Sequence, residues 1–378
     1  MPNLKQKINK LIKPLRGEHE ADRSLVVTVG IIIIFGLIML SSASSIVAYA
    51  QQGDSYYFVK HQLVGLFLGL IAFWFFSRYD YHNLKRYAFG LLIFSIILLS
   101  LVFVPGLGYE HGSTRSWIKI FGQSLQPSEF VKLFFLIYLV AWLERRSQKL
   151  EEWRQGIGPF MIVLGVIIGL MVLQPDIGTL SIIAITSLIV YFIAGGSLKH
   201  IIIFLIIVII SFALLIQIKP YQMNRFKCLI DPEFSKQDIC YQVNQSLIAV
   251  GSGGILGRGF GASRQKYLYL PEIQGDSIFA IIGEETGLIF SGALVMLFLF
   301  LFYRGFLIAR QAPDNFGKYL AIGIVSWIVI QAMINIGGMI NLLPMTGVPL
   351  PLISYGGSAM LATLMALGIL VNISKQTR

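Results

Sequence analysis

Charged residues are scarce in this chain of 378 residues. Only 13% of the residues are Asp, Glu, Lys or Arg, whereas 56% are hydrophobic. An ordinary soluble domain carries roughly 25% charged residues. A soluble core could not bury this much apolar surface, so the composition predicts an integral membrane protein.

Several functional motifs are also missing. The chain has no dinucleotide-binding fingerprint, no Walker A sequence, no His/Cys metal cluster and no RNA- or DNA-binding motif. The net charge of +11 comes from basic residues in short clusters between apolar stretches. Such clusters are typical of a membrane topology signal, so we expect no nucleic acid partner.

Ten stretches reach the about 20 apolar residues that a membrane-spanning helix needs. They are centred near residues 35, 68, 96, 136, 166, 187, 209, 289, 328 and 364. The first is too long for a signal-peptide core and is interpreted as a retained helix. The fifth and sixth are separated only by QPDIG at 174–178. The sequence therefore predicts an all-α membrane fold of about ten transmembrane helices.

The distribution of basic residues predicts the topology. If the N-terminus is cytoplasmic, the segments on its side hold 19 of the 30 Lys and Arg residues, and the short outer loops hold three. The positive-inside rule then places both termini in the cytoplasm. We expect a cytoplasmic tail over 1–23, one membrane domain over 24–373 and a C-terminal tail over 374–378.

One outer loop, over 219–275, is long and contains seven Lys and Arg residues. Long loops cross the membrane largely regardless of charge. Its stretch QSLIAVGSGGILGRGFG is apolar and rich in glycine, so we expect a folded, partly membrane-embedded segment. The only two cysteines, Cys228 and Cys240, lie in this loop, either as a disulfide that closes a short loop or as two unrelated thiols.

Three carboxylates enter the eighth apolar stretch, in YLPEIQGDSIFAIIGEETGLIF. Ionisable groups in a membrane are costly and mark function, unless they form structural ion pairs. Asp276 lies at the outer end, where substrate can reach it and the apolar interior can raise its pKa toward that of a base. Glu284 lies roughly 12 Å deeper on broadly the same side, and Glu285 points nearly opposite Asp276. We expect both glutamates to be structural.

A second polar group lies in QPSEFVK, where Glu129 and Lys132 are i,i+3 neighbours on one helix face. The alternative is a self-satisfied ion pair without a further role. Upstream, Arg115, Trp117 and Lys119 form a basic and aromatic patch at the outer interface. The patch suits a phosphate-bearing lipid, although ordinary interfacial side chains would give the same pattern.

Irregular backbone is predicted in two further places. Gln174 precedes Pro175 at the break between the fifth and sixth helices, and NLLPMTGVPLPLISYGGS follows the ninth. The second segment has three prolines, three glycines and no charge. Non-helical backbone at membrane depth is tolerated only when it is buried or lines a cavity. We predict a re-entrant segment that walls an outward-facing cavity, with structural roles for Pro351, Ser354, Tyr355, Gly356 and Gly357.

The motifs GVPLPLISYGGS, LQPSEFVKL, QPDIGTL and YLPEIQGDSIFAIIGEETGL together resemble those of the SEDS (shape, elongation, division and sporulation) family. The resemblance runs in order from about residue 25 to 373. The run SRQKYLYLPE is similar to the division branch, FtsW, rather than the elongation branch, RodA.

The resemblance implies a peptidoglycan glycosyltransferase that polymerises lipid II at the outer face of the cytoplasmic membrane. It implies a class B penicillin-binding protein and other divisome or elongasome membrane proteins as partners. The family's proposed catalytic aspartate falls on Asp276, its Glu and Lys on Glu129 and Lys132, and an arginine on Arg225.

In one place the sequence departs from the family pattern. Gln274-Gly275 stands where members commonly have His-Thr, which puts the geometry before Asp276 in doubt. In the implied reaction Asp276 takes the proton of an acceptor 4-hydroxyl, and undecaprenyl pyrophosphate leaves with inversion. Fixed cations would stabilise the leaving group, with a divalent cation (Mg²⁺ or Mn²⁺) as a further aid. The candidate cations and substrate-binding groups are Arg115, Glu129, Lys132, Gln174, Arg225, Arg264 and Lys266.

Other functions remain open. A lipid II flippase would carry ionisable groups at several depths on several helices, whereas here they gather at outer helix ends, with Glu284 and Glu285 as exceptions. A non-catalytic scaffold that recruits a transpeptidase would leave Asp276 replaceable. A RodA-type elongation polymerase would share the chemistry with different partners.

Overall fold

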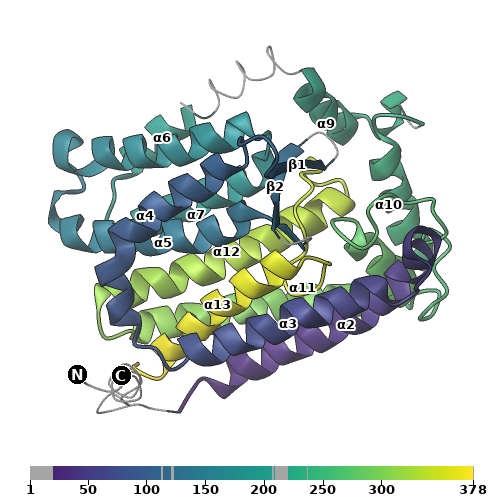
Figure 1. The fold of residues 1–378 in the computed structure, drawn as a ribbon, viewed down its shortest axis with the longest axis horizontal. Coiled ribbons are helices and arrows are strands. Elements are labelled where there is room, and N and C mark those ends of the chain that lie inside the picture. The colour runs from purple at the N-terminus through teal and green to yellow at the C-terminus, as the bar shows by residue number, and fades with distance from the viewer. Residues whose placement is uncertain are drawn as a thin grey trace.

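The computed structural model describes residues 20–111, 114–120, 123–206, 208, 220–235 and 237–377. Long helices lie side by side in a bundle (Figure 1). The long helices are α2 (Arg23–Gln52), α3 (Tyr57–Phe76), α4 (Leu84–Leu101), α5 (Pro127–Arg146), α6 (Gly158–Leu173), α7 (Ile177–Ile193), α11 (Ile278–Gln311), α12 (Asn315–Met339) and α13 (Gly357–Ser374). Short helical turns are η1 (Tyr81–Asn83), η2 (Ser147–Lys149), η3 (Trp153–Ile157) and η4 (Pro232–Ser235).

Nine of the ten predicted spans coincide with these long helices, each of which contains a predicted centre. The tenth centre, near 209, lies outside the described residues, beyond a helix over 198–206. Within the described chain, seven helices are long and apolar enough to cross a membrane, and α7 is a shorter apolar helix. The protein is therefore a multi-pass, all-α membrane protein, as predicted.

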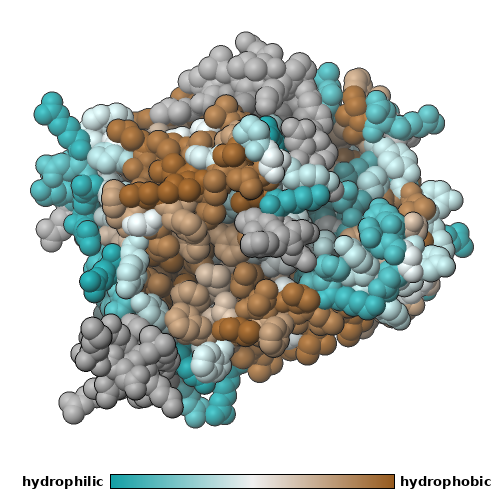
Figure 2. Space-filling view, in the orientation of Figure 1, coloured by the Kyte–Doolittle hydropathy of each residue, from teal (hydrophilic) through white to brown (hydrophobic). Residues whose placement is uncertain are grey.

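The bundle is built around α12, whose apolar window is 89% buried, compared with 22% for α3. It contacts α5, α7, α11 and α13. On the face in Figure 2 an apolar band separates two polar ends, as expected for a protein surrounded by hydrocarbon. Lipid is as apolar as leucine, so close helix approach relies on small residues. At the contact of α3 with α13, a Cβ on Gly65 would lie 2.8 Å from the Gly357 Cα.

A small antiparallel sheet was not predicted from the sequence. Strands β1 (Gly108–His111), β2 (Thr114–Ile120) and β3 (Gln123–Leu125) pair in that order between α4 and α5. Tyr109 pairs with Trp117, and Lys119 pairs with Ser124. The sheet gives the predicted basic and aromatic patch a fixed backbone at the end of the bundle.

The loop predicted over 219–275 is folded in its described residues. It contains α9 (Pro220–Ile230) and α10 (Tyr241–Gly253), and α10 packs against α11. Cys228 and Cys240 are joined by a disulfide, which decides between the two alternatives that the sequence left open. A disulfide is expected on the extracytoplasmic side of a bacterial membrane.

The loop also supplies backbone hydrogen bonds at an interruption in α11. Gly287 interrupts α11 with φ +70° and ψ −172°. The backbone N–H groups of Arg258 and Gly259 donate to the carbonyls of Glu284 and Glu285, both at 3.0 Å, and Leu288 N–H donates back to the loop. A backbone break at membrane depth must be satisfied by protein, and the segment over 254–259 does this for α11. The expectation of a folded loop is confirmed, and its position in the membrane stays a prediction.

The segment between α12 and α13, over 340–356, has no helix and enters the bundle as predicted. Leu342 and Leu343 near its start are exposed, whereas Val348, Leu350, Leu352 and Ile353 are buried. Gln62 of α3 donates to the Ser354 carbonyl at 3.0 Å and accepts from the Gly356 N–H at 3.0 Å. The part of the segment from Val348 onward is thus a fixed part of the interior.

Candidate active site

Asp276 lies in the turn that precedes α11, between α10, α12 and the 340–356 segment. Its side chain is partly exposed. A Cβ on Gly347 would lie 3.7 Å from Asp276 Oδ2, so the close approach of the 340–356 segment suits glycine. Asp276 Oδ1 is buried and accepts no hydrogen bond within the described residues. That oxygen keeps an unused acceptor site, which is closed to solvent in this structure.

The backbone around Asp276 is held on several sides. Ser354 Oγ donates to the Gly275 carbonyl at 2.6 Å, and the Tyr355 N–H donates to the Gln274 carbonyl at 2.8 Å. Asn335 Nδ2 donates to the Asp276 carbonyl itself at 2.7 Å. A Cβ at Gly275 would meet nothing closer than 3.6 Å. The departure from the family pattern at Gln274-Gly275 therefore leaves an intact turn.

The surroundings of Asp276 favour its protonated form. Burial, and then the neighbouring Glu272 carboxylate, raise the pKa of Asp276 to about 6. A hydrogen bond from Gln242 and the charge of Arg225 act in the opposite direction. A general base works best when its pKa lies near the operating pH. Asp276 is mostly ionised at neutral pH and is still basic enough to accept a proton.

The predicted cations lie in different environments. The charge of Arg225 on α9 lowers the pKa of Asp276. The Nη1 of Arg225 donates to the Met345 carbonyl at 2.9 Å. Arg264 is exposed, whereas Arg115 lies on β2 with its Nε buried and without a partner among the described residues. Of these arginines, Arg225 is the one that the structure brings to the aspartate.

Lys266 and the two glutamates of α11 form a buried polar cluster. Lys266 Nζ lies 3.1 Å from Glu285 Oε1, which also accepts from Ser42 Oγ of α2 at 2.8 Å. Glu284 accepts from Ser263 Oγ at 2.6 Å and from the Arg264 N–H at 2.9 Å. In this structure the Lys266 ammonium therefore neutralises Glu285 and faces away from solvent.

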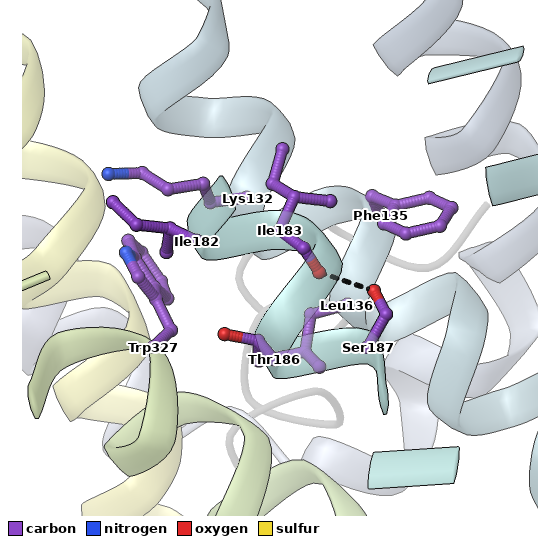
Figure 3. Close-up of a pocket in the computed structure, with 8 residues that line it drawn as sticks. All are labelled: Lys132, Phe135, Leu136, Ile182, Ile183, Thr186, Ser187 and Trp327. Carbon is purple, nitrogen blue, oxygen red and sulfur yellow. Dashed lines mark hydrogen bonds between the residues drawn. The ribbon is translucent and has the colours of Figure 1, made fainter. Parts of the chain in front are cut away.

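Glu129 and Lys132 form a second buried ion pair on α5. Lys132 Nζ lies 2.8 Å from Glu129 Oε1 and donates to Gln331 Oε1 at 2.6 Å. It also lies 5.0 Å from the centre of the Trp327 ring. Lys132 and Trp327 border one side of a small internal cavity, opposite Phe135 (Figure 3). The ammonium thus points into the bundle, toward α12.

Replacing Lys132 alone should destabilise the protein far more than removing the whole pair. Lys132→Met leaves the Glu129 carboxylate buried without compensation, which costs about 3–5 kcal/mol. The double variant Glu129→Gln, Lys132→Met removes both charges and should recover most of that loss. The midpoint of thermal unfolding in detergent measures the difference, and equal midpoints for the two variants would contradict it.

The remaining predicted residues make structural contacts between the helices and the irregular segments. Gln174 is fully buried and its Nε2 donates to the Leu99 carbonyl of α4 at 2.8 Å. Pro351 is buried, and Gly357 lies against Gly65 of α3. These contacts join α3, α4 and α6 to the irregular segments that the sequence indicated.

The structure offers no ready metal centre in its described part, where no group of three or more His, Cys, Asp or Glu side chains is arranged to hold a metal ion. Glu129, the buried carboxylate of α5, is already paired with the Lys132 ammonium. The residues around Glu129 therefore do not fit a divalent cation, which elsewhere remains a prediction from the resemblance.

Sequence reasoning gave no role to three amides next to these groups. Gln242 of α10 lies beside the Asp276 carboxylate and donates to Ser277 Oγ at 3.0 Å. Gln331 contacts Lys132, and Asn335 contacts the Asp276 carbonyl. The i,i+4 spacing of Gln331 and Asn335 on an otherwise apolar helix was the signal that could have paired them.

A family model for FtsW, RodA and SpoVE, described as "Cell cycle protein", matches residues 22–378. The chain belongs to this family. Among its FtsW/RodA/SpoVE relatives, Stage V sporulation protein E of Bacillus subtilis (strain 168) is 38% identical over 357 residues, which cover 94% of this chain and 98% of the relative. A probable peptidoglycan glycosyltransferase FtsW of Geobacter sp. (strain M18) is 34% identical over 364 residues, 96% of this chain and 99% of the relative.

A solved structure of a peptidoglycan synthase complex, described as coordinating polymerization and crosslinking, contains a similar FtsW/RodA/SpoVE-like chain. Its TM-score is 0.77, with 25% sequence identity, over 94% of this chain and 97% of that chain. The SEDS resemblance and the membrane fold predicted from the sequence are thereby confirmed. The choice of the division branch stays a prediction.

Proposed function

We propose that this protein is a peptidoglycan glycosyltransferase that polymerises lipid II at the outer face of the cytoplasmic membrane. The observation that carries the proposal is Asp276. It is a partly exposed carboxylate at the end of a membrane helix, with one unpaired oxygen and a pKa raised to about 6. The relatives named as probable peptidoglycan glycosyltransferases support the same activity.

In the proposed reaction Asp276 accepts the proton of the 4-hydroxyl of an acceptor lipid II. The freed oxygen attacks the anomeric carbon of the growing chain, and the bond to undecaprenyl pyrophosphate breaks. One displacement inverts the anomeric centre and gives a β-1,4 linkage. Arg225, whose charge acts on Asp276, would stabilise the charge that develops on the leaving group.

The position of Asp276 at the end of a membrane helix suits a substrate that has a water-soluble part and a lipid part. Lipid II has a water-soluble sugar head and a tail that stays in hydrocarbon, so its reactive bond lies at the membrane boundary. We assign the end of the bundle with the disulfide and Asp276 to the extracytoplasmic side, and both termini to the cytoplasm. The first described residues and the end of α13 lie together, since the Asp22 N–H donates to Ser374 Oγ at 3.2 Å.

A class B penicillin-binding protein is the proposed partner, together with other divisome membrane proteins. The similar chain in a complex that coordinates polymerization and crosslinking supports such an assembly. We propose the division branch, with a role in septal synthesis, because SRQKYLYLPE is similar to that branch and several relatives are named FtsW.

The test is polymerisation of lipid II by the purified chain, alone and with its cognate class B penicillin-binding protein. Glycan chains in either setting would establish the polymerase, and chains only with the partner would show that the partner activates it. If neither setting gives chains and the protein moves lipid II across liposomes, the flippase reading replaces the proposal.

The rate of polymerisation should fall as the pH drops through about 6. Asp276 acts as a base only when it is ionised, and its raised pKa puts its protonation in that range. Glu272→Gln removes a charge that raises this pKa, so the acidic limb of kcat/KM should move to lower pH. The profile is measured from about pH 5 to pH 8.

Asp238→Asn is the matched control for Glu272→Gln, because it removes an exposed carboxylate from the same outer loop. It should leave the acidic limb where it is. A limb that stays in place in Glu272→Gln would mean that Asp276 does not set it.

A further inference from the structure

Two amides lie one turn apart on α12, the most buried long helix of the bundle. Gln331 and Asn335 are 1% and 3% exposed. Gln331 Nε2 donates to the Pro349 carbonyl at 3.0 Å, and Asn335 Nδ2 donates to the Val348 carbonyl at 2.8 Å. The two amides therefore donate hydrogen bonds to two successive residues of the 340–356 segment. Buried amides inside a membrane protein are tolerated when they are paired in this way.

The other contacts of the two amides lead in different directions. Gln331 Oε1 accepts from Lys132 Nζ at 2.6 Å and from Trp327 Nε1 at 2.9 Å. Asn335 Nδ2 also donates to the Asp276 carbonyl at 2.7 Å. One face of α12 thus touches both the buried Lys132 ion pair and the turn that carries the aspartate.

The contacts of Asn335 with Asp276 and Val348 together use both N–H donors of its side-chain amide. A side-chain amide has two N–H donors and one carbonyl acceptor. The two donors bind the Asp276 and Val348 carbonyls, so Asn335 holds the turn and the 340–356 segment together. Its own Oδ1 is buried and has no partner in the described part of the chain, as is also true of Asp276 Oδ1.

We propose that Asn335 is a positioning residue for the reaction, which fixes the backbone of Asp276, and that Gln331 ties the same helix to Lys132. The inference rests on the proposed function. Through these two amides α12 sets the place of the base relative to the buried cation. A displacement of about 1 Å at a reacting group can cost roughly 100-fold in rate, so loss of the Asn335 contact should be visible in kcat.

A purely structural role for Asn335 makes a different prediction, and Asn372 is the matched control. Asn372 is 1% exposed on α13, its Nδ2 donates to the Ser77 carbonyl at 3.3 Å, and its Oδ1 accepts from the Tyr81 N–H at 3.1 Å. It is as buried and as well bonded as Asn335, but it lies at the opposite end of the bundle.

The experiment measures the kcat and KM of lipid II polymerisation by the purified full chain, together with thermal unfolding. Asn335→Ser should lower kcat by about 10- to 100-fold with little change in KM. Asn335→Asp should lower kcat to a similar extent, because a carboxyl group cannot donate to both the Asp276 and Val348 carbonyls. Asn372→Ser and Asn372→Asp should keep kcat, even if they unfold at lower temperature.

Two results would overturn the inference. If the folded Asn335 variants keep the parent kcat and lose only stability, Asn335 does not position the base. If Asn335→Asp does not fold, the kcat and KM of Asn335→Ser decide alone. A parent protein that makes no glycan chains overturns the proposed function and this inference with it, whereas an active parent with unaffected Asn335 variants overturns the inference only.

Discussion

Replacing Asp276 by Asn should stop glycan synthesis. Asn has nearly the same shape as Asp but cannot accept the proton of the attacking hydroxyl. Removal of a general base lowers a rate by about 10²- to 10⁴-fold. The effect should fall on kcat, since an Asn side chain of the same shape leaves the substrate-binding surface in place.

The same substitution should not weaken the fold. Burial and Glu272 raise the pKa of Asp276 from 3.8 to about 6, so the folded state binds the proton more tightly than the unfolded chain does. The ionised carboxylate therefore destabilises the folded state as the pH rises above 3.8, and the penalty is complete above about pH 6. A shift of about two units corresponds to at most ~3 kcal/mol. Asp276→Asn removes this penalty at neutral pH.

Polymerisation and thermal unfolding should be measured on the same preparation of Asp276→Asn. The expected outcome is an inactive protein that unfolds at the parent temperature or above it. Asp54→Asn is the control, because Asp54 lies in the loop between α2 and α3 and pairs with Lys60 at 2.6 Å. That variant should stay active. Glycan chains from folded Asp276→Asn would remove Asp276 from the mechanism.

The second large effect is expected at Gly287, where Ala should prevent stable folding. The φ and ψ of Gly287, +70° and −172°, lie in a region that only glycine adopts readily. A Cβ there would lie 2.2 Å from the Gly257 backbone nitrogen and 2.6 Å from the Ile255 carbonyl oxygen. Both are backbone atoms that cannot rotate away. Strain and clash together should cost several kcal/mol, a large part of the 5–15 kcal/mol that stabilises a typical protein.

Gly292→Ala is the matched control for this prediction. Gly292 lies five residues further along α11, and a Cβ there would meet nothing within 4 Å. Alanine is also the better helix former, so this variant should be as stable as the parent or more stable. The yield of monodisperse protein in detergent and its unfolding midpoint compare the two. Equal values for Gly287→Ala and Gly292→Ala would show that the break in α11 can straighten.

The helices were predictable because the length of an apolar run is itself the signal. Hydropathy could not distinguish α12, which is buried in the bundle, from α3, which is mostly exposed to lipid, since both environments are apolar. The strands β1 to β3 were missed because they are short and contain charged side chains such as Arg115 and Lys119. Their pairing depends on contacts between neighbouring chain segments rather than on an apolar pattern.

The site could be predicted only in part, for a related reason. Asp276 could be found because a carboxylate at the edge of an apolar run is costly and usually marks a functional site. The partner of Lys266 could not be found, since Glu285 is 19 residues away and the run between them contains irregular turns. Asn335 lies 59 residues from Asp276, and spacing alone says nothing about a contact over that distance.

The break in α11 also bears on how the protein is made. Around Gly287 the backbone of α11 cannot form its own helical hydrogen bonds. It bonds instead to the backbone of the segment over 254–259. In hydrocarbon no water can replace those partners, and each unpaired group would cost several kcal/mol. The segment precedes α11 in the chain and so leaves the ribosome first. We therefore expect the segment and α11 to fold as one unit, because α11 has no other backbone partner at this break within the described chain.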